Sequence, residues 1–304
     1  MLKRMRICES KVVEDGGGQC QISIFINPDE AERRTLIDSF RLYEHTLNSS
    51  LDPNELARME FEPEHIAVIT KRPKRYSAAD NFLFHISSIG LFMFPDHLVI
   101  VLNEDIPLFE GKPFSRVNSV QELALKIIYR SIFHFEEHLR IINMCSDELE
   151  KEINRAMENK TLLNLFTLEK SLVYYLNAIS SNGRVIEKFR ANAGRIGLTG
   201  ENLELLDDLA IENAQCHEQA QIYSEVLSGL MDARVSIVSN NLNVLMKTLN
   251  IIMIGLMVPT LFVSIFSMNL NIPMMHHPLA FWFVLVGSAA LTSTVILISK
   301  LKKW

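Results

Sequence analysis

An uncharged polar run near the C-terminal end of this sequence carries residues suited to ion chemistry. Residues 266–282 read FSMNLNIPMMHHPLAFW and include Asn269. Its amide oxygen accepts hydrogen bonds from water without carrying a charge. Because Mg²⁺ gives up its water shell reluctantly, a ring of such oxygens can hold the hydrated ion and still release it. The simpler alternative is that Asn269 only caps the end of a helix.

Polar residues and methionines precede this run at steps of three or four. Such steps place side chains on one face of a helix. We call these residues the polar stripe: Asn243, Met246, Asn250, Met253, Met257, Thr260 and Ser264. The stripe fits the wall of an ion pore, but small and polar residues also join membrane helices by packing. Both interpretations bring several copies of the helix together.

Two apolar segments flank the polar run. Residues 249–266 and 279–299 contain no charged side chain. At about 1.5 Å per residue each spans roughly the 30 Å hydrocarbon core of a bilayer. We therefore expect membrane helices at about 247–267 and 279–300, joined by an outer loop at 268–278, in a C-terminal membrane domain of residues 247–304.

The lysines indicate an orientation. Lys247 precedes the first apolar segment, and Lys300, Lys302 and Lys303 follow the second, where several copies would form a basic ring. The connecting loop has no lysine or arginine, so the positive-inside rule predicts both termini in the cytoplasm. No apolar stretch follows the basic start of the chain, so we expect no signal peptide. The expected location is the inner or plasma membrane, with multiple passes.

Composition excludes some partners. The net charge of −6 argues against nucleic acid, which requires a basic face. An acidic cytoplasmic part attracts cations instead. The cysteines are scattered without paired spacing, so we expect reduced thiols. They are Cys8, Cys20, Cys145 and Cys216.

Residues 1–118 predict a cytoplasmic α/β domain. Short runs rich in Ile, Val and Phe predict strands at 20–27, 65–72, 82–94 and 97–104. Helical patterns occur at 28–47 and, more weakly, at 52–62. The glycines at 16–18 precede a strand rather than a helix, so they indicate a hairpin turn and not a phosphate loop.

Residues 119–246 predict long helices and a stalk. Apolar residues recur at steps of three and four over about 120–157 and 161–193, and a glycine-containing turn follows. A third helix begins near Glu201 and shows no break before the membrane. An exposed helix of that length needs partners along its side, so we expect self-association.

The motif HFEEH raises one enzymatic alternative. His134 and His138 are four residues apart, as in some zinc peptidases, with Glu137 in the catalytic position. Nothing nearby supplies a third metal ligand. We therefore expect an ordinary helix face and no enzyme activity.

Residues 239–269, SNNLNVLMKTLNIIMIGLMVPTLFVSIFSMN, resemble the CorA family of magnesium channels. In that family a Gly-Met-Asn signature ends the first membrane helix; here Ser267, Met268 and Asn269 take its place. Lys247, Pro259 and Phe262 also match its pattern. The resemblance is strong over 200–304 and architectural before that. It implies a funnel-shaped homopentamer whose first membrane helices line the pore.

The resemblance also implies roles for single residues. Ser267, Met268 and Asn269 form the selectivity filter. Leu249 joins the polar stripe among the pore-lining residues. Asp232 and Asp208 bind regulatory Mg²⁺ between subunits and keep the stalk closed. No cofactor is implied beyond Mg²⁺ as substrate and regulator.

Two departures from the family bear on the ion. Ser267 replaces the signature glycine, and the outer loop lacks acidic residues but contains His276 and His277, which suit softer ions. The expected function is Mg²⁺ influx driven by the membrane potential. The alternatives are a zinc or cobalt/nickel transporter of the same family, and a two-span membrane receptor, for which the outer loop is short.

Overall fold

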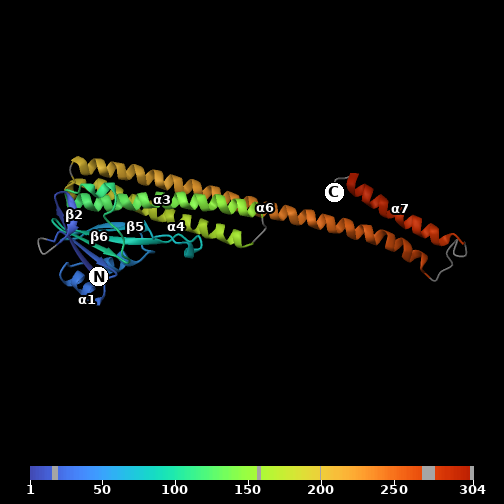
Figure 1. The fold of residues 1–304 in the computed structure, drawn as a ribbon, viewed down its shortest axis with the longest axis horizontal. Coiled ribbons are helices and arrows are strands. Elements are labelled where there is room, and N and C mark those ends of the chain that lie inside the picture. Colours follow the sequence, from blue (N-terminus) through green and yellow to red (C-terminus); the bar gives the residue numbers. More distant parts are fainter. Residues whose placement is uncertain (16–19, 156–158, 199, 269–277, 302–304) are drawn as a thin grey trace. The chain divides into compact units, whose positions relative to one another are not determined.

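The computed structural model describes residues 1–15, 20–155, 159–198, 200–268 and 278–301. It divides into two compact units, Met1–Leu230 and Met231–Trp304. Helix α6, Gly200–Phe266, runs through the division (Figure 1). The first unit is an α/β fold and the second holds two apolar helices, so the predicted fold class is confirmed.

A mixed sheet forms the centre of the first unit. Within the described residues it has seven strands in the order β2-β1-β3-β7-β6-β5-β4. β3 and β7 pair in parallel, and the other neighbours are antiparallel. The strands are β1 Leu2–Cys8, β2 Lys11–Glu14, β3 Ile22–Ile26, β4 Arg58–Phe61, β5 Ile66–Pro73, β6 Ile86–Met93 and β7 Leu98–Leu102. β3 and β7 are buried throughout, which suits their unbroken apolar sequences.

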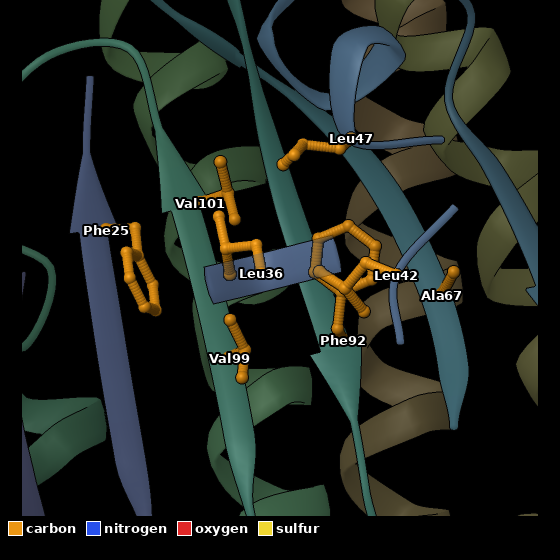
Figure 2. Close-up of a cluster of buried hydrophobic side chains, with 8 residues drawn as sticks. All are labelled: Phe25, Leu36, Leu42, Leu47, Ala67, Phe92, Val99 and Val101. Carbon is orange, nitrogen blue, oxygen red and sulfur yellow. The ribbon is translucent and has the colours of Figure 1, made fainter. Parts of the chain in front are cut away.

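Two short helices cover one face of the sheet, α1 Glu30–Asp38 and α2 Glu44–Leu51. Between them and the strands lies an apolar cluster (Figure 2) that comprises Phe25, Leu36, Leu42, Leu47, Ala67, Phe92, Val99 and Val101. Gly90 of β6 allows α2 to lie close, because a Cβ there would be 2.6 Å from the Cβ of Ser50. This face is therefore covered by α1 and α2, the two helices that follow β3 in the sequence.

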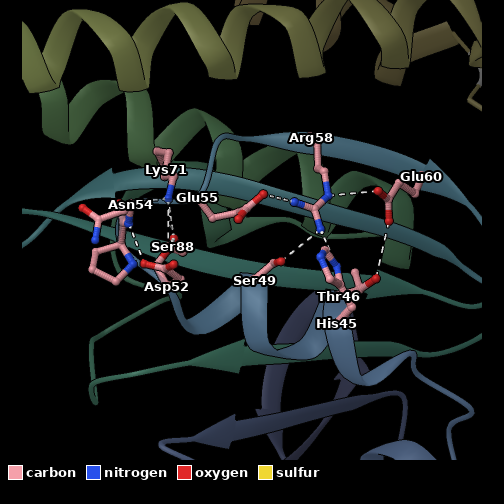
Figure 3. A network of polar contacts seen from close by, with 11 residues as sticks. His45, Thr46, Ser49, Asp52, Asn54, Glu55, Arg58, Glu60, Lys71 and Ser88 are labelled. Carbon is pink, nitrogen blue, oxygen red and sulfur yellow. Dashed lines mark hydrogen bonds and ion pairs between the residues drawn. The ribbon is translucent and has the colours of Figure 1, made fainter.

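Long helices cover the opposite face; in Figure 3 they lie above the strands, and the short helix that carries Ser49 lies below them. The long helices are α3 Val120–Arg155 and α4 Asn159–Ala191, and the first part of α6 packs on α4. α6 buries Leu206, Leu209 and Cys216, and the Nδ2 of Asn213 donates to the carbonyl of Ile179 at 3.2 Å. The short helix α5, Ala193–Ile196, ends at Gly197, whose positive φ of 79° turns the chain toward α6. The three predicted long helices are confirmed.

Two helix predictions in the first domain are wrong. The pattern at 28–47 divides into α1 and α2, because Arg41 adopts φ +53° and Leu42 turns into the apolar cluster. The segment at 52–62 forms a loop and then β4. There Met59 is buried while Arg58 and Glu60 lie on the other face, so the local period is two rather than 3.6.

Polar contacts hold the loop before β4 in place (Figure 3). The Nζ of Lys71 donates to the carbonyls of Asp52 and Pro53 at 3.2 and 3.1 Å, and to Ser88 Oγ at 2.6 Å. Burial lowers the pKa of Lys71 to about 8. Arg58 pairs with Glu55 and Glu60 at the other end. Long-range contacts of this kind override a weak local helical pattern.

Strand ends also differ from the sequence prediction. The run at 82–94 becomes a strand only from Ile86, because Asn81 and Phe82 have positive φ. The turn of the β1–β2 hairpin falls at Glu9 and Ser10, whereas the glycines at 16–18 lie outside the described residues. Two 3₁₀ turns complete the first unit, η1 Ala78–Asp80 and η2 Lys112–Ser115.

Asn182 ties α4 to the open end of β5. The pairing of β4 with β5 stops at Ile69, so the backbone of Lys71 has no strand partner on that side. The Oδ1 of Asn182 accepts from the Lys71 amide at 2.8 Å, and its Nδ2 donates to the Lys71 carbonyl at 2.8 Å. Thr70 Oγ1 donates to the same Oδ1 at 3.0 Å. The fully buried amide therefore replaces a strand neighbour.

Asn182→Ala should destabilise the first unit. It leaves a buried donor and a buried acceptor unpaired, at a cost of about 2–4 kcal/mol in the free energy of unfolding. For a unit of this size the melting temperature should fall by about 5–10 °C. Thermal unfolding of the full chain measures the change. Asn177→Ala, at an exposed position of the same helix, is the control, and equal melting temperatures for the two variants would contradict the role of Asn182.

Candidate ion pathway along helix α6

The C-terminal part of α6 has apolar side chains that remain exposed within the described residues. Leu256, Met257 and Leu261 are 66%, 63% and 67% exposed. The most apolar window of α6, and that of helix α7, Ala280–Leu301, contain no buried residue. Soluble proteins rarely expose apolar surface this extensive, which agrees with two helices that are long and apolar enough to cross a membrane.

The polar stripe lies within this part of α6 on unbroken α-helix. Its steps alternate between three and four residues and average 3.5, the period of helices that pack side by side in a left-handed supercoil. Leu249 is next to Asn250 in sequence and lies at the edge of that face. All eight side chains are exposed. One chain therefore presents the stripe but does not enclose a path.

The Thr260 hydroxyl of the stripe uses its proton within the helix. Thr260 Oγ1 donates to the carbonyl of Leu256 at 2.6 Å. A hydroxyl bonded in this way keeps its oxygen lone pairs available. It can therefore accept a hydrogen bond from water. Such an oxygen suits contact with a hydrated cation.

Pro259 interrupts the hydrogen bonds of α6 between the two ends of the stripe. Proline has no amide hydrogen, so the carbonyl of Gly255 loses its usual partner four residues on. Nothing lies within 4 Å of the position that a Gly255 side chain would occupy. The turn from Gly255 to Pro259 therefore lacks one backbone hydrogen bond.

α6 ends at Phe266, and Ser267 closes its last turn. The Ser267 amide donates to the carbonyls of Val263 and Ser264, both at 3.2 Å. Its Oγ also donates to the Ser264 carbonyl, at 2.9 Å. Met268 follows and is 52% exposed. Asn269, His276 and His277 lie outside the described residues.

A glycine sets the contact between the two apolar helices. A Cβ on Gly287 of α7 would lie 2.9 Å from two ring carbons of Phe262 on α6. The Phe262 ring in turn packs edge-on against Phe266, with centroids 5.1 Å apart. Small residues at membrane helix interfaces allow this close approach. The sequence analysis did not single out Gly287, although a glycine inside an apolar helix is the signal for it.

The carboxylates predicted to bind regulatory metal are exposed. Asp208 and Asp232 both lie on the surface of α6. Asp208 contributes with Glu212 and Glu136 to the negative surroundings that, after burial, raise the pKa of Tyr129. Among the described residues, no three His, Cys, Asp or Glu side chains are arranged to hold a metal ion.

Of the predicted basic ring, the structure describes only the backbone of Lys300. Lys300 belongs to α7, but its side chain is outside the described residues, and so are Lys302 and Lys303. Lys247 lies on α6 at the start of the uncharged stretch. From residue 248 to residue 299 the sequence contains no charged side chain.

The HFEEH histidines serve the core of the first unit. The Nδ1 of His138 lies 2.8 Å from the hydroxyl of Tyr175, which is fully buried on α4. The rings of His134 and His138 are 4.6 Å apart. Burial, together with the charge of Arg72, lowers the pKa of His138 to about 4. These contacts favour packing over metal ligation.

The fold and the stripe define a membrane protein with two apolar spans, the first of which carries polar and methionine side chains along one face. The chain belongs to the family described as CorA-like Mg2+ transporter protein, whose model matches residues 19–303. This is a family of transporters rather than enzymes. The resemblance found in the sequence is therefore confirmed.

Individual relatives agree along most of the chain. The cobalt/magnesium transport protein CorA of Methanocaldococcus jannaschii is 22% identical over 289 residues, which cover 91% of this chain and 89% of the relative. The complete structure of the CorA magnesium transporter from that organism has a TM-score of 0.83 at 20% identity and covers 98% and 96% of the two chains. The full-length CmaX protein has a TM-score of 0.75 at 14% identity and covers 100% and 97%. These structures share the fold.

Gly287→Val should separate the two apolar helices, because the added methyl groups would occupy the place of the Phe262 ring. We expect a lower melting temperature of the detergent-solubilised protein, measured by the loss of the native peak in size-exclusion chromatography after heating. Adding Phe262→Ala should restore much of the loss. Ala289→Val, at an exposed position of the same helix, is the control. Equal stability of Gly287→Val and the control would contradict the contact.

Proposed function

We propose that the protein is a Mg²⁺ influx channel in which several identical chains enclose the ion path with their α6 helices. The observation that carries this proposal is the exposed polar stripe on the uncharged part of α6, in a member of a Mg²⁺ transporter family. A stripe of amide, hydroxyl and thioether groups gives water and hydrated ions polar contacts without a fixed charge that would trap them.

The assembly that we propose is a homopentamer. Residues 1–118 form its cytoplasmic domain, 119–246 its long helices and stalk, and 247–304 its membrane domain. Support comes from the stripe period, which suits side-by-side helices, and from apolar side chains that a single chain leaves exposed. By the positive-inside rule, the lysines at both ends of the uncharged stretch support a cytoplasmic position for the two termini.

Selection of the ion takes place at Ser267, Met268 and Asn269. In a ring of chains the amide oxygens of Asn269 accept hydrogen bonds from the waters around Mg²⁺. The ion keeps its shell, so the filter does not have to supply the large cost of dehydration. The oxygens of the stripe then guide the hydrated ion along α6.

The membrane potential drives the flux. A charge that crosses a potential of 100 mV gains about 2.3 kcal/mol, so a divalent ion gains about 4.6 kcal/mol. With an inward driving force of this size, the channel must be able to close when the cell holds enough Mg²⁺. Cytoplasmic Mg²⁺ bound by Asp208 and Asp232 between neighbouring chains closes it, because the ion offsets their repulsion and holds the closed arrangement.

Softer divalent ions are the second candidate for transport. The curated relative is named as a cobalt/magnesium transport protein, and the outer loop of this chain contains His276 and His277. Imidazole favours Co²⁺, Ni²⁺ and Zn²⁺ over Mg²⁺. Comparing the flux of all four ions in the same vesicles separates these candidates.

Asn269→Ala should abolish Mg²⁺ flux and leave assembly intact, because the truncated side chain cannot hold the water shell. The measurement is Mg²⁺ entry into liposomes that contain the purified protein and a Mg²⁺-sensitive dye. Asn271→Ala, two residues further along the same loop, is the matched control and should retain flux. Normal flux through Asn269→Ala would contradict the filter assignment. Native mass spectrometry of the same samples tests whether five chains assemble.

Asp232→Asn should weaken inhibition by internal Mg²⁺, because the neutral amide removes one charge from the metal site. We expect the half-inhibiting concentration to rise at least about threefold, in keeping with weakened carboxylate ligation. Glu218→Gln, at an exposed position of the same helix, should leave the value unchanged. The double variant Asp208→Asn/Asp232→Asn covers redundancy. Unaltered inhibition of the double variant would contradict a sensing role for both aspartates.

A further inference from the structure

A cavity of about 260 Å³ opens beside the sheet of the first unit. Three arginines and one histidine share its wall: Arg72, Arg75, Arg130 and His134. The rest of the described lining is apolar or neutral, and it contains no aspartate or glutamate. In a protein with a net charge of −6 this is an unusual concentration of positive charge.

Arg72 forms the floor of this arginine cavity. Only 5% of its surface is exposed, and it remains charged because a guanidinium does not lose its proton in proteins. Its Nε donates to the carbonyl of Pro73 at 3.0 Å, and its Nη2 lies 3.3 Å from Glu104 Oε1. Glu104 is the carboxylate that offsets Arg72. It does not offset the other two arginines as well.

Arg130 and Arg75 stand nearer the mouth. The closest carboxylate recorded for Arg130 is Glu137, at 3.9 Å, and both side chains are about 40% exposed. A long and solvated ion pair of this kind contributes little. Arg75 is exposed. The cavity therefore has one paired guanidinium at its floor and two weakly compensated ones around it.

His134 reports the positive potential inside the cavity. Burial, followed by the charges of His138, Arg72 and Arg130, lowers its pKa to about 3. The imidazole is therefore neutral at physiological pH. A neutral imidazole both donates and accepts a hydrogen bond, so it can serve the protonated or the ionised oxygen of an anion.

We propose that the arginine cavity binds a phosphate group. Guanidinium groups match phosphate oxygens with two parallel hydrogen bonds, and these are among the strongest that proteins form. A volume of 260 Å³ corresponds to roughly nine waters at about 30 Å³ each, enough for a phosphate or diphosphate and some attached group. Ile106 and Leu108 provide an apolar wall for that group.

This site is independent of ion conduction. None of its residues belongs to the polar stripe or to the proposed metal sites on α6. Its occupant can be a free phosphate compound or the headgroup of a lipid, since both present the same phosphate oxygens. Binding can be measured without any transport assay, so the result does not depend on the proposed channel function.

The test is equilibrium dialysis of the full-length protein in detergent with ³²P-labelled pyrophosphate. We expect saturable binding at one site per chain. Arg75→Ala and Arg130→Ala should each weaken it at least about tenfold, as the loss of a charge-assisted hydrogen bond predicts. Arg140→Ala removes an exposed arginine from the same helix as Arg130 and should bind normally.

Competition identifies the source of the phosphate. Displacement by inorganic phosphate at least as readily as by dihexanoyl phosphatidic acid supports a free phosphate compound, and the reverse order supports a lipid headgroup. Absence of saturable pyrophosphate binding up to about 10 mM would overturn the proposal. Equal binding by the wild type, Arg75→Ala and Arg130→Ala would overturn it as well.

A spectroscopic readout separates binding from a structural role. An anion beside Arg72 and Arg130 offsets their charge, so it should raise the pKa of His134. With ¹³C-labelled histidine in the full chain, the His134 resonance, assigned from a His134→Gln sample, should titrate at higher pH when pyrophosphate is present. An unchanged titration at saturating pyrophosphate would overturn the assignment to this cavity.

Discussion

The uncharged stretch from residue 248 to residue 299 constrains the rest of the molecule. In a bilayer every backbone amide and carbonyl must find a partner within the protein, and a helix supplies these partners locally. The hydroxyls follow the same rule, as the bond from Thr260 to the Leu256 carbonyl shows. The side chains of the stripe remain without cover from their own chain. The bilayer requires the chain to cross as helices, and in the proposed channel the uncovered stripe of each helix requires several chains to assemble.

Helix α6 contains both a part that packs in the α/β unit and the first apolar span. It is one element from Gly200 to Phe266, and its first part buries Leu206, Leu209 and Cys216 in the α/β unit. A helix passes on displacement along its length because its hydrogen bonds are all internal. In the proposed channel the carboxylates and the polar stripe lie on one such helix, which gives a direct route for control of the path. Pro259 is the position on that helix where one backbone hydrogen bond is lost.

The elements with the longest repeating patterns were the most predictable from the sequence. The long helices and both apolar spans were predictable because their periods repeat many times and tertiary contacts only reinforce them. The structures of residues 28–47 and 52–62 were not predictable, because they depend on contacts distant in sequence. Leu42 packs in the apolar cluster, and the ammonium of Lys71 binds both Ser88 and the loop before β4. The arginine cavity leaves no local pattern, since Arg72 and Arg130 come from β5 and α3. Gly287 can be noticed in the sequence as a glycine within an apolar segment, but its contact with Phe262 cannot be predicted from the sequence.

Ser267 is the residue where this chain departs from its family's signature, and its geometry limits what the departure does. Its hydroxyl proton is bonded to the Ser264 carbonyl at 2.9 Å, so the substitution adds no free donor that would repel a cation. The hydroxyl oxygen still accepts, as a water ligand would. What glycine would have provided is backbone freedom, and here the helix closes on Val263 and Ser264 without it. In the proposed filter the contacts with the hydrated ion are therefore left to Asn269, and the serine is expected to cost backbone flexibility rather than affinity for ions.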